Sequence, residues 1–129
     1  MPRYLLDSNI LILALRGRTE ALDLLAQICE QDDGYISVVT RIEILAGMRP
    51  REEMATTELL ASLPSLAVDP AVADRSGRLI RDSALQGAQL TFADALIAAT
   101  ALEHDLTLVT TNARHFQIAG LLLQSFPPA

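Results

Sequence analysis

Apolar residues along the chain alternate between short β-rich runs and longer segments with helical spacing. The short runs predict five strands, at residues 3–6, 35–39, 66–68, 106–110 and 121–126. Apolar positions recur every three or four residues between them, which predicts helices from about residue 8, then over 19–31, 40–47, 52–63, 70–85 and 92–103. Strands that alternate with helices favour right-handed crossovers and a parallel sheet covered on both faces. The pattern therefore predicts a three-layer α/β/α sandwich.

Local signals set the expected boundaries of these elements. Thr19, Thr40 and Thr91 are predicted to cap helices, because a hydroxyl can accept a hydrogen bond from a free N–H in the first turn. Pro64 and Gly87 are predicted to end helices. No internal repeat or flexible linker interrupts the pattern, so we expect one domain over residues 1–129.

Composition supports a packed core and a reducing environment. Half of the 129 residues are hydrophobic, yet the longest apolar runs, such as Ile10 to Leu15, are far too short to span a membrane. Asp7 and Asn9 interrupt what would be the apolar stretch of a signal peptide. The single cysteine, Cys29, cannot form an internal disulfide and is expected to be a buried, inert thiol. We therefore expect a cytoplasmic protein.

The charged residues exclude several chemistries. Sixteen acidic residues face ten basic ones, and all ten are arginine. Without lysine, a Walker-type phosphate loop, a Schiff-base enzyme and a Ser–Lys hydrolase are excluded. The net charge of −6 argues against broad coating of nucleic acid, but it allows an enzyme that grips nucleic acid through a few arginines and a cation.

Acidic side chains follow the predicted strands at the edge where parallel sheets place their chemistry. Asp7 follows the first strand, Glu43 comes within a helical turn of the second, and Asp94 lies in the first turn of the helix that opens at Thr91. Thr111 and Asn112 follow the strand at 106–110. The sequence thus predicts that three carboxylates and an amide meet at one edge.

Helix capping is the simpler explanation for two of these acids. Glu43 and Asp94 each stand three residues after a threonine, which is the spacing of a capping box. Asp7 is harder to explain, because it interrupts a buried apolar stretch, where a carboxylate is costly unless it is paired or binds a metal. Convergence of all three favours a bound cation, and an all-oxygen ligand set suits Mg²⁺ or Mn²⁺. Such ions activate water and stabilise the charge that develops on a phosphodiester.

Four motifs carry a resemblance to a known family. They are Leu6-Asp7-Ser8-Asn9, Ser37-x-x-Thr40-x-x-Glu43-Ile44-x-x-Gly47, Thr91-x-x-Asp94-x-x-Ile97-Ala98-Ala99 and Leu108-Val109-Thr110-Thr111-Asn112-x-x-x-Phe116. In this order and spacing, over residues 5–116, the chain resembles the PIN-domain ribonucleases, specifically the VapC toxins of type II toxin–antitoxin pairs.

The resemblance implies a PIN fold with a central five-stranded parallel sheet and an acidic site at Asp7, Glu43 and Asp94. Asp7 and Asp94 inherit the role of metal ligands, and Glu43 would orient the attacking water or hold a second ion. The implied activity is endonucleolytic cleavage of RNA with Mg²⁺, or Mn²⁺ as a substitute. The implied partners are the RNA substrate, a cognate VapB-type antitoxin and a second copy of the chain in a homodimer, within larger toxin–antitoxin complexes.

The chain departs from the family at one position. Many relatives carry a fourth aspartate where His115 stands, which leaves Asn112 as the remaining polar candidate and puts a second firmly bound ion in doubt. Thr110, Thr111 and Ser8 are candidates to contact phosphate or the metal's waters, unless they only cap or end secondary-structure elements. The RNA backbone is predicted to contact Arg75, Arg78 and Arg81, unless these arginines form a solvated helix face. A second copy of the chain is predicted to contact segment 52–63 through Met54, Leu59, Leu60 and Leu63.

The sequence allows two other functions. A non-catalytic PIN-fold module would bind RNA or protein without cutting it, although such a module would be expected to lose acids that this chain retains. A phosphatase of the haloacid-dehalogenase type is suggested only by an aspartate after the first strand. That family needs a second aspartate where Asn9 stands and a lysine, and the chain has neither.

Overall fold

A parallel sheet organises the protein. A computed structural model describes residues 2–127 and shows five strands in the order β3-β2-β1-β4-β5, all paired in parallel. The strands are β1 (Tyr4–Leu6), β2 (Gly34–Ser37), β3 (Ser65–Leu66), β4 (Thr107–Thr110) and β5 (Leu123–Ser125). The predicted five-stranded parallel sheet is confirmed.

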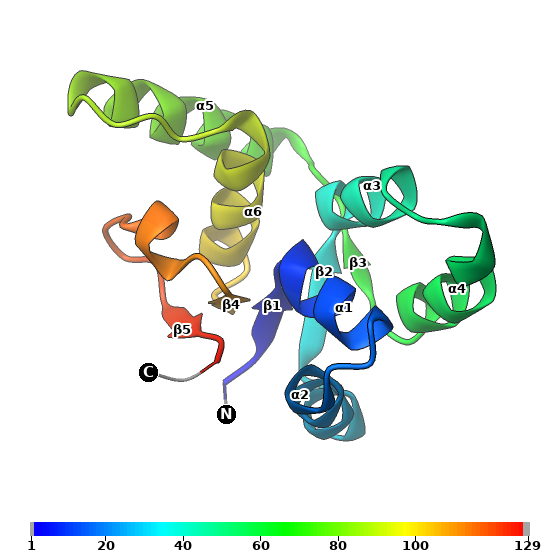
Figure 1. The fold of residues 1–129 in the computed structure, drawn as a ribbon. Helices are drawn as coiled ribbons and strands as arrows, with labels where there is room; N and C mark the ends of the chain where they lie inside the picture. Colours follow the sequence, from blue (N-terminus) through cyan, green and yellow to red (C-terminus); the bar gives the residue numbers. More distant parts are fainter. Residues whose placement is uncertain (1, 128–129) are drawn as a thin grey trace.

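Helices fill the crossovers between the strands. They are α1 (Ser8–Leu15), α2 (Thr19–Glu30), α3 (Val38–Ala46), α4 (Glu53–Ala61), α5 (Pro70–Leu85) and α6 (Phe92–Glu103), with short 3₁₀ helices η1 (Pro50–Glu52) and η2 (Ala113–Phe116). Side-chain caps open four of them: Asp7 on α1, Ser37 on α3, Asp69 on α5 and Thr91 on α6. Three of these helices start directly after β1, β2 and the 86–91 loop, at the carboxyl edge of the sheet (Figure 1).

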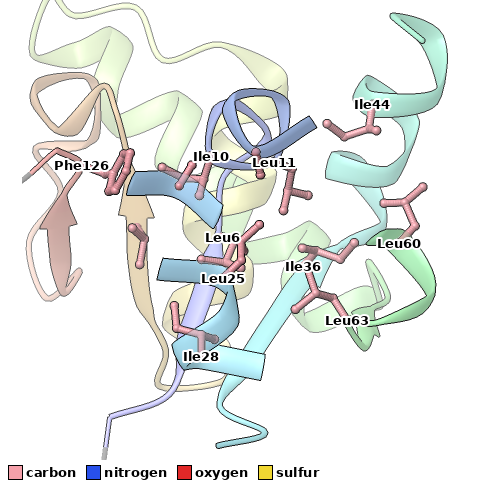
Figure 2. Packing of buried hydrophobic residues seen from close by; sticks show 13 residues of the cluster. Leu6, Ile10, Leu11, Leu25, Ile28, Ile36, Ile44, Leu60, Leu63 and Phe126 are labelled. Carbon is pink, nitrogen blue, oxygen red and sulfur yellow. The ribbon is translucent and has the colours of Figure 1, made fainter. Parts of the chain in front are cut away.

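Two apolar clusters, one on each face of the sheet, give the molecule its three layers. Neighbouring strand residues alternate between them, so Leu6 and Val109 face one cluster while Leu5 and Leu108 face the other. Figure 2 shows the first cluster, in which Leu6 and Ile36 meet side chains of α1 and α2. The second cluster packs α6 and η2 against the opposite face.

Some boundaries differ from the predicted ones, and each difference has a local cause. Val38 and Val39 belong to α3 rather than to β2, because the Ser37 hydroxyl accepts a hydrogen bond from Val39 N at 3.0 Å and opens the helix early. Thr40 is therefore inside the helix, and its buried hydroxyl has no partner within residues 2–127. Thr19 begins α2 without capping it, since Arg18 occupies the cap position and makes no side-chain bond there.

The predicted dimer face on segment 52–63 is wrong. Leu60 and Leu63 are only 3 % and 4 % exposed and belong to the core, and Leu59 packs against them. Met54 alone of the four is well exposed, at 76 %. Packing of α4 against α1 and α3 in the first cluster accounts for the apolar spacing of Leu60 and Leu63.

Cys29 is free and half-buried, and it packs against the first cluster. None of the helices within residues 2–127 has both the length and the apolar character needed to cross a membrane.

Candidate active site

Asp7 is the most firmly held acid of the site. It follows β1 directly, and its side chain is 6 % exposed. One carboxylate oxygen, Oδ1, accepts a hydrogen bond from Ser8 N at 2.8 Å, and Oδ2 accepts one from the Thr110 hydroxyl at 2.8 Å. Both oxygens are thereby fixed, so Asp7 has one defined orientation at the carboxyl edge of the sheet.

Glu43 lies in the second turn of α3, and its side chain is exposed. Since the helix opens at Ser37 rather than at Thr40, Glu43 is too far along the helix to complete a capping box. The capping explanation is therefore wrong for Glu43. Ser8, the first residue of α1, lies close enough to Glu43 to lower its pKa.

Asp94 lies in the first turn of α6, half-buried. Its backbone N–H donates to the Thr91 hydroxyl at 3.1 Å, as the sequence predicts for this cap. Within residues 2–127 the Asp94 carboxylate makes no hydrogen bond in return, so only half of a capping box is formed. The carboxylate remains available for chemistry.

Electrostatics shows that the three acids share one region. Burial raises the pKa of Asp7 above its ordinary value, its hydrogen bonds from Thr110 and Ser8 lower it, and the charge of Asp94 raises it. Burial also raises the pKa of Glu43, and the nearby charges of Asp7 and Asp94 raise it further. The structure thus brings together the three carboxylates that the sequence singled out.

The segment after β4 completes the site with hydroxyl and amide groups. The Thr110 hydroxyl donates to Asp7 and accepts a hydrogen bond from Asn112 N at 3.0 Å. The Thr111 hydroxyl accepts one from Asn9 Nδ2 at 3.2 Å. The sequence did not assign these roles to Thr110 and Asn9. The signal for Thr110 lay in strand register, because the pairing of Leu6 with Val109 sets the next residues, Asp7 and Thr110, beside each other.

Other predicted site residues lie farther from the acids or have other partners. Arg75 on α5 forms an ion pair with Glu103 of α6, and Arg81 approaches Asp82 at 3.9 Å. Arg78 is exposed on the same helix. His115 is exposed on η2 and lines a cavity beside α5 rather than contributing to the electrostatics of Asp7 or Glu43.

The donor set fits a divalent cation in its chemistry. The set consists of carboxylate oxygens, whose negative charges repel one another. Within the described part of the chain, Asp7, Glu43 and Asp94 form no salt bridge. Across residues 2–127, no three Asp, Glu, His or Cys side chains already stand in a closed metal-binding arrangement. Asp7 is fixed by its two hydrogen bonds, whereas the Glu43 and Asp94 side chains are accessible enough to adjust their positions.

Comparisons with known proteins agree with the fold and identify the family. The PIN domain family model matches residues 4–121. The chain is 38 % identical over 122 residues to the protein named Ribonuclease VapC10 of Mycobacterium tuberculosis, covering 95 % of this chain and 92 % of that protein.

The fold of this chain is similar to the folds of two solved structures. The crystal structure of VapBC2 from Rickettsia felis, bound to a DNA fragment from its promoter, superposes with a TM-score of 0.86 at 22 % identity and covers 95 % of this chain and 98 % of that one. A toxin–antitoxin complex from Klebsiella pneumoniae gives a TM-score of 0.74 at 32 % identity, with 92 % and 95 % covered. The α/β sandwich with its acidic carboxyl edge is a PIN domain, and the chain belongs to the VapC family of ribonuclease toxins.

Proposed function

We propose that this protein is an endoribonuclease that hydrolyses RNA phosphodiester bonds with Mg²⁺, or with Mn²⁺ in its place, and acts as the toxin of a type II pair in the cytoplasm. The observation that carries the proposal is the mutual repulsion of Asp7, Glu43 and Asp94 at one edge of the sheet. Such repulsion is costly unless a cation relieves it. Membership in the VapC ribonuclease family supports RNA as the substrate.

Asp7 and Asp94 are the residues that would hold the ion. The hydrogen bonds from Thr110 and Ser8 N fix Asp7 before substrate arrives, so little reorganisation is needed at this ligand. When bound, the ion would lower the pKa of a water molecule and stabilise negative charge on the phosphate.

Glu43 is suited to receive the proton of the attacking water. It is exposed at the site, and its pKa is raised by burial and by its two acidic neighbours, which makes it a stronger base than an ordinary glutamate. Ser8 neighbours both acids, because its backbone N–H binds Asp7 while its side chain lowers the pKa of Glu43.

We also propose an antitoxin partner and a homodimer. The solved relatives include toxins in complex with antitoxins, which supports a cognate VapB-type partner for this chain. An acidic site in a protein of net charge −6 attracts a basic peptide segment, and an arginine could replace the charge of the ion. Exposed apolar side chains that a second copy could cover include Ile42 and Leu45 on α3, which are 65 % and 46 % exposed, and Met54 on α4.

An RNA-cleavage assay with sequenced products tests the proposal. Purified protein should cut single-stranded or looped RNA at internal positions when Mg²⁺ or Mn²⁺ is present, leaving 5′-phosphate ends. Excess chelator should stop the reaction, and so should the antitoxin encoded beside this gene. Full cleavage in chelator would refute the metal-dependent mechanism, and an absence of cleavage with every ion would favour a non-catalytic binding module.

A further inference from the structure

A cavity of about 360 Å³ lies beside the acidic edge, and the proposed mechanism does not use it. Its walls come from the second half of α5, the loop 86–90 and the segment 114–119. In Figure 1, η2, drawn in orange, lies below α5 and beside α6. The volume of the cavity falls in the range typical of sites for small organic groups.

Two chain segments connect this cavity directly to the acids. The loop 86–90 leads into Thr91, the cap of the helix that carries Asp94. On the other side, η2 follows Asn112, whose N–H binds the Thr110 hydroxyl that in turn binds Asp7. The cavity is therefore bordered by the two segments that lead to Asp94 and to the Thr110–Asp7 hydrogen bond.

The lining of the cavity suits a nucleobase rather than a phosphate. Half-buried Leu79, Leu90 and Ile118 supply an apolar surface. Asp82 also lines the cavity, and its charge disfavours an anion there but accepts hydrogen bonds from base amino groups such as cytosine N4. Gln86 and Gln89 add amide groups that can pair with base edges.

Arg114 and His115 provide the contacts expected for the rest of a nucleotide. Both side chains are exposed on η2 and line the cavity. Arg114 forms no salt bridge within residues 2–127, unlike Arg75, so its guanidinium is available for a phosphate. The imidazole of His115 offers a flat face for stacking, which is the usual way to hold an unpaired RNA base.

We propose that this cavity is a nucleotide subsite for the RNA strand beside the scissile bond, with Arg114 on the phosphate, His115 against the base and Asp82 at the base edge. This inference rests on the proposed ribonuclease function, which it deepens by naming where an unpaired base is held. It gives His115 a role in substrate binding instead of metal binding.

Binding of a short oligonucleotide tests the subsite separately from cleavage. The probes are a hexamer of deoxycytidine and an abasic hexamer with the same phosphates, each titrated in Mg²⁺ and again in chelator. The chain contains two histidines, so the imidazole NMR signals of His115 and His104 can be followed individually. The deoxycytidine hexamer should shift the His115 signal and leave His104, at the far end of α6, unchanged.

Matched variants identify the contacts. Arg114→Gln and His115→Ala should each weaken binding of the deoxycytidine hexamer about tenfold, while Arg51→Gln on η1 should bind like the parent. Loss of the bases should weaken binding to the parent by a similar factor. Equal affinity of both hexamers, or an unmoved His115 signal, would overturn the subsite. Binding with these properties by a protein that cuts no RNA would uphold the subsite and refute the proposed function.

Discussion

Two groups of charged side chains at opposite edges of the sheet differ in their partners. At the amino edge Arg75 pairs with Glu103 near the end of α6, and the Arg3 guanidinium donates to the backbone oxygen of His104. At the carboxyl edge Asp7, Glu43 and Asp94 raise one another's electrostatic energy without a salt bridge in the described residues. The Arg75–Glu103 pair neutralises its own charges, whereas the three acids at the carboxyl edge keep an unfavourable charge arrangement that a cation would relieve.

Removing the charge of Asp7 should have the largest effect. Asp7→Asn should lower RNA cleavage about 10²–10³-fold, because the ion loses its fixed ligand, a loss of several kcal/mol in transition-state stabilisation. The metal-free variant should be as stable as the parent or more stable, since the asparagine oxygen can still cap α1 and repulsion is relieved. Cleavage rates and urea unfolding check both parts.

Asp105→Asn is the matched control for this change. Asp105 is exposed beyond the opposite end of α6 and has a left-handed backbone, with φ of 53°, that asparagine tolerates well. The Asp105→Asn variant should cleave RNA at the parent rate. A loss of activity in both variants, or a marked destabilisation by Asp7→Asn, would contradict the division between the two edges.

The pH dependence of metal-free stability is expected to show a smaller effect at the carboxyl edge. The pKa values of Asp7 and Glu43 are raised in the folded state, mainly by burial, from ordinary values of 3.8 and 4.5. The folded protein therefore keeps protons that the unfolded chain has lost, and stability falls as the pH rises through the folded pKa values.

The double variant Asp7→Asn/Glu43→Gln isolates this contribution. Urea midpoints measured from about pH 4 to pH 8 should show the variant gaining on the parent as the pH rises, because other groups titrate alike in both proteins. A stability difference that stays constant over this range would show that the pKa values of the two carboxylates are not raised in the folded state.

Breaking the ion pair at the amino edge should have the smallest effect. Arg75 and Glu103 are 37 % and 24 % exposed, so solvent screens their attraction, and Arg75→Gln or Glu103→Gln should cost less than about 1 kcal/mol. RNA cleavage should be unchanged. A double-mutant cycle measures the coupling, and a specific loss of activity in Arg75→Gln would instead place this arginine on the RNA backbone, as its spacing with Arg78 and Arg81 suggests.

The sequence predicts most of the sheet and the three acids because both depend on local pattern and on the order of strands and helices. It fails where two local choices compete. Ser37 and Thr40 are both good caps, and in the folded chain Ser37 caps the helix while Val39 packs in the second cluster and the Thr40 hydroxyl is buried. The apolar spacing of α4 equally fits a core face or a dimer face, and burial of Leu60 and Leu63 decides for the core.

Contacts between distant strands are the other part that sequence does not contain. The bond from Thr110 to Asp7 depends on β4 pairing with β1, and the same alternation of strands and helices is compatible with other strand orders. A motif match brings Asp94 and Asp7 into one site by resemblance. The hydroxyl and amide groups that hold Asp7 become visible only in the folded chain.

The hydrogen bond between Thr110 and Asp7 also has a consequence during translation. Its two residues are 103 positions apart, so the ribosome makes the first acid long before the strand that fixes it. Parallel pairing of β4 with β1 requires the whole intervening crossover to be in place. A nascent chain therefore contains Asp7 before the strand pairing and the Thr110 hydroxyl that orient its carboxylate. The ribosome that synthesises this toxin meets an assembled site only after nearly all of the polypeptide has emerged.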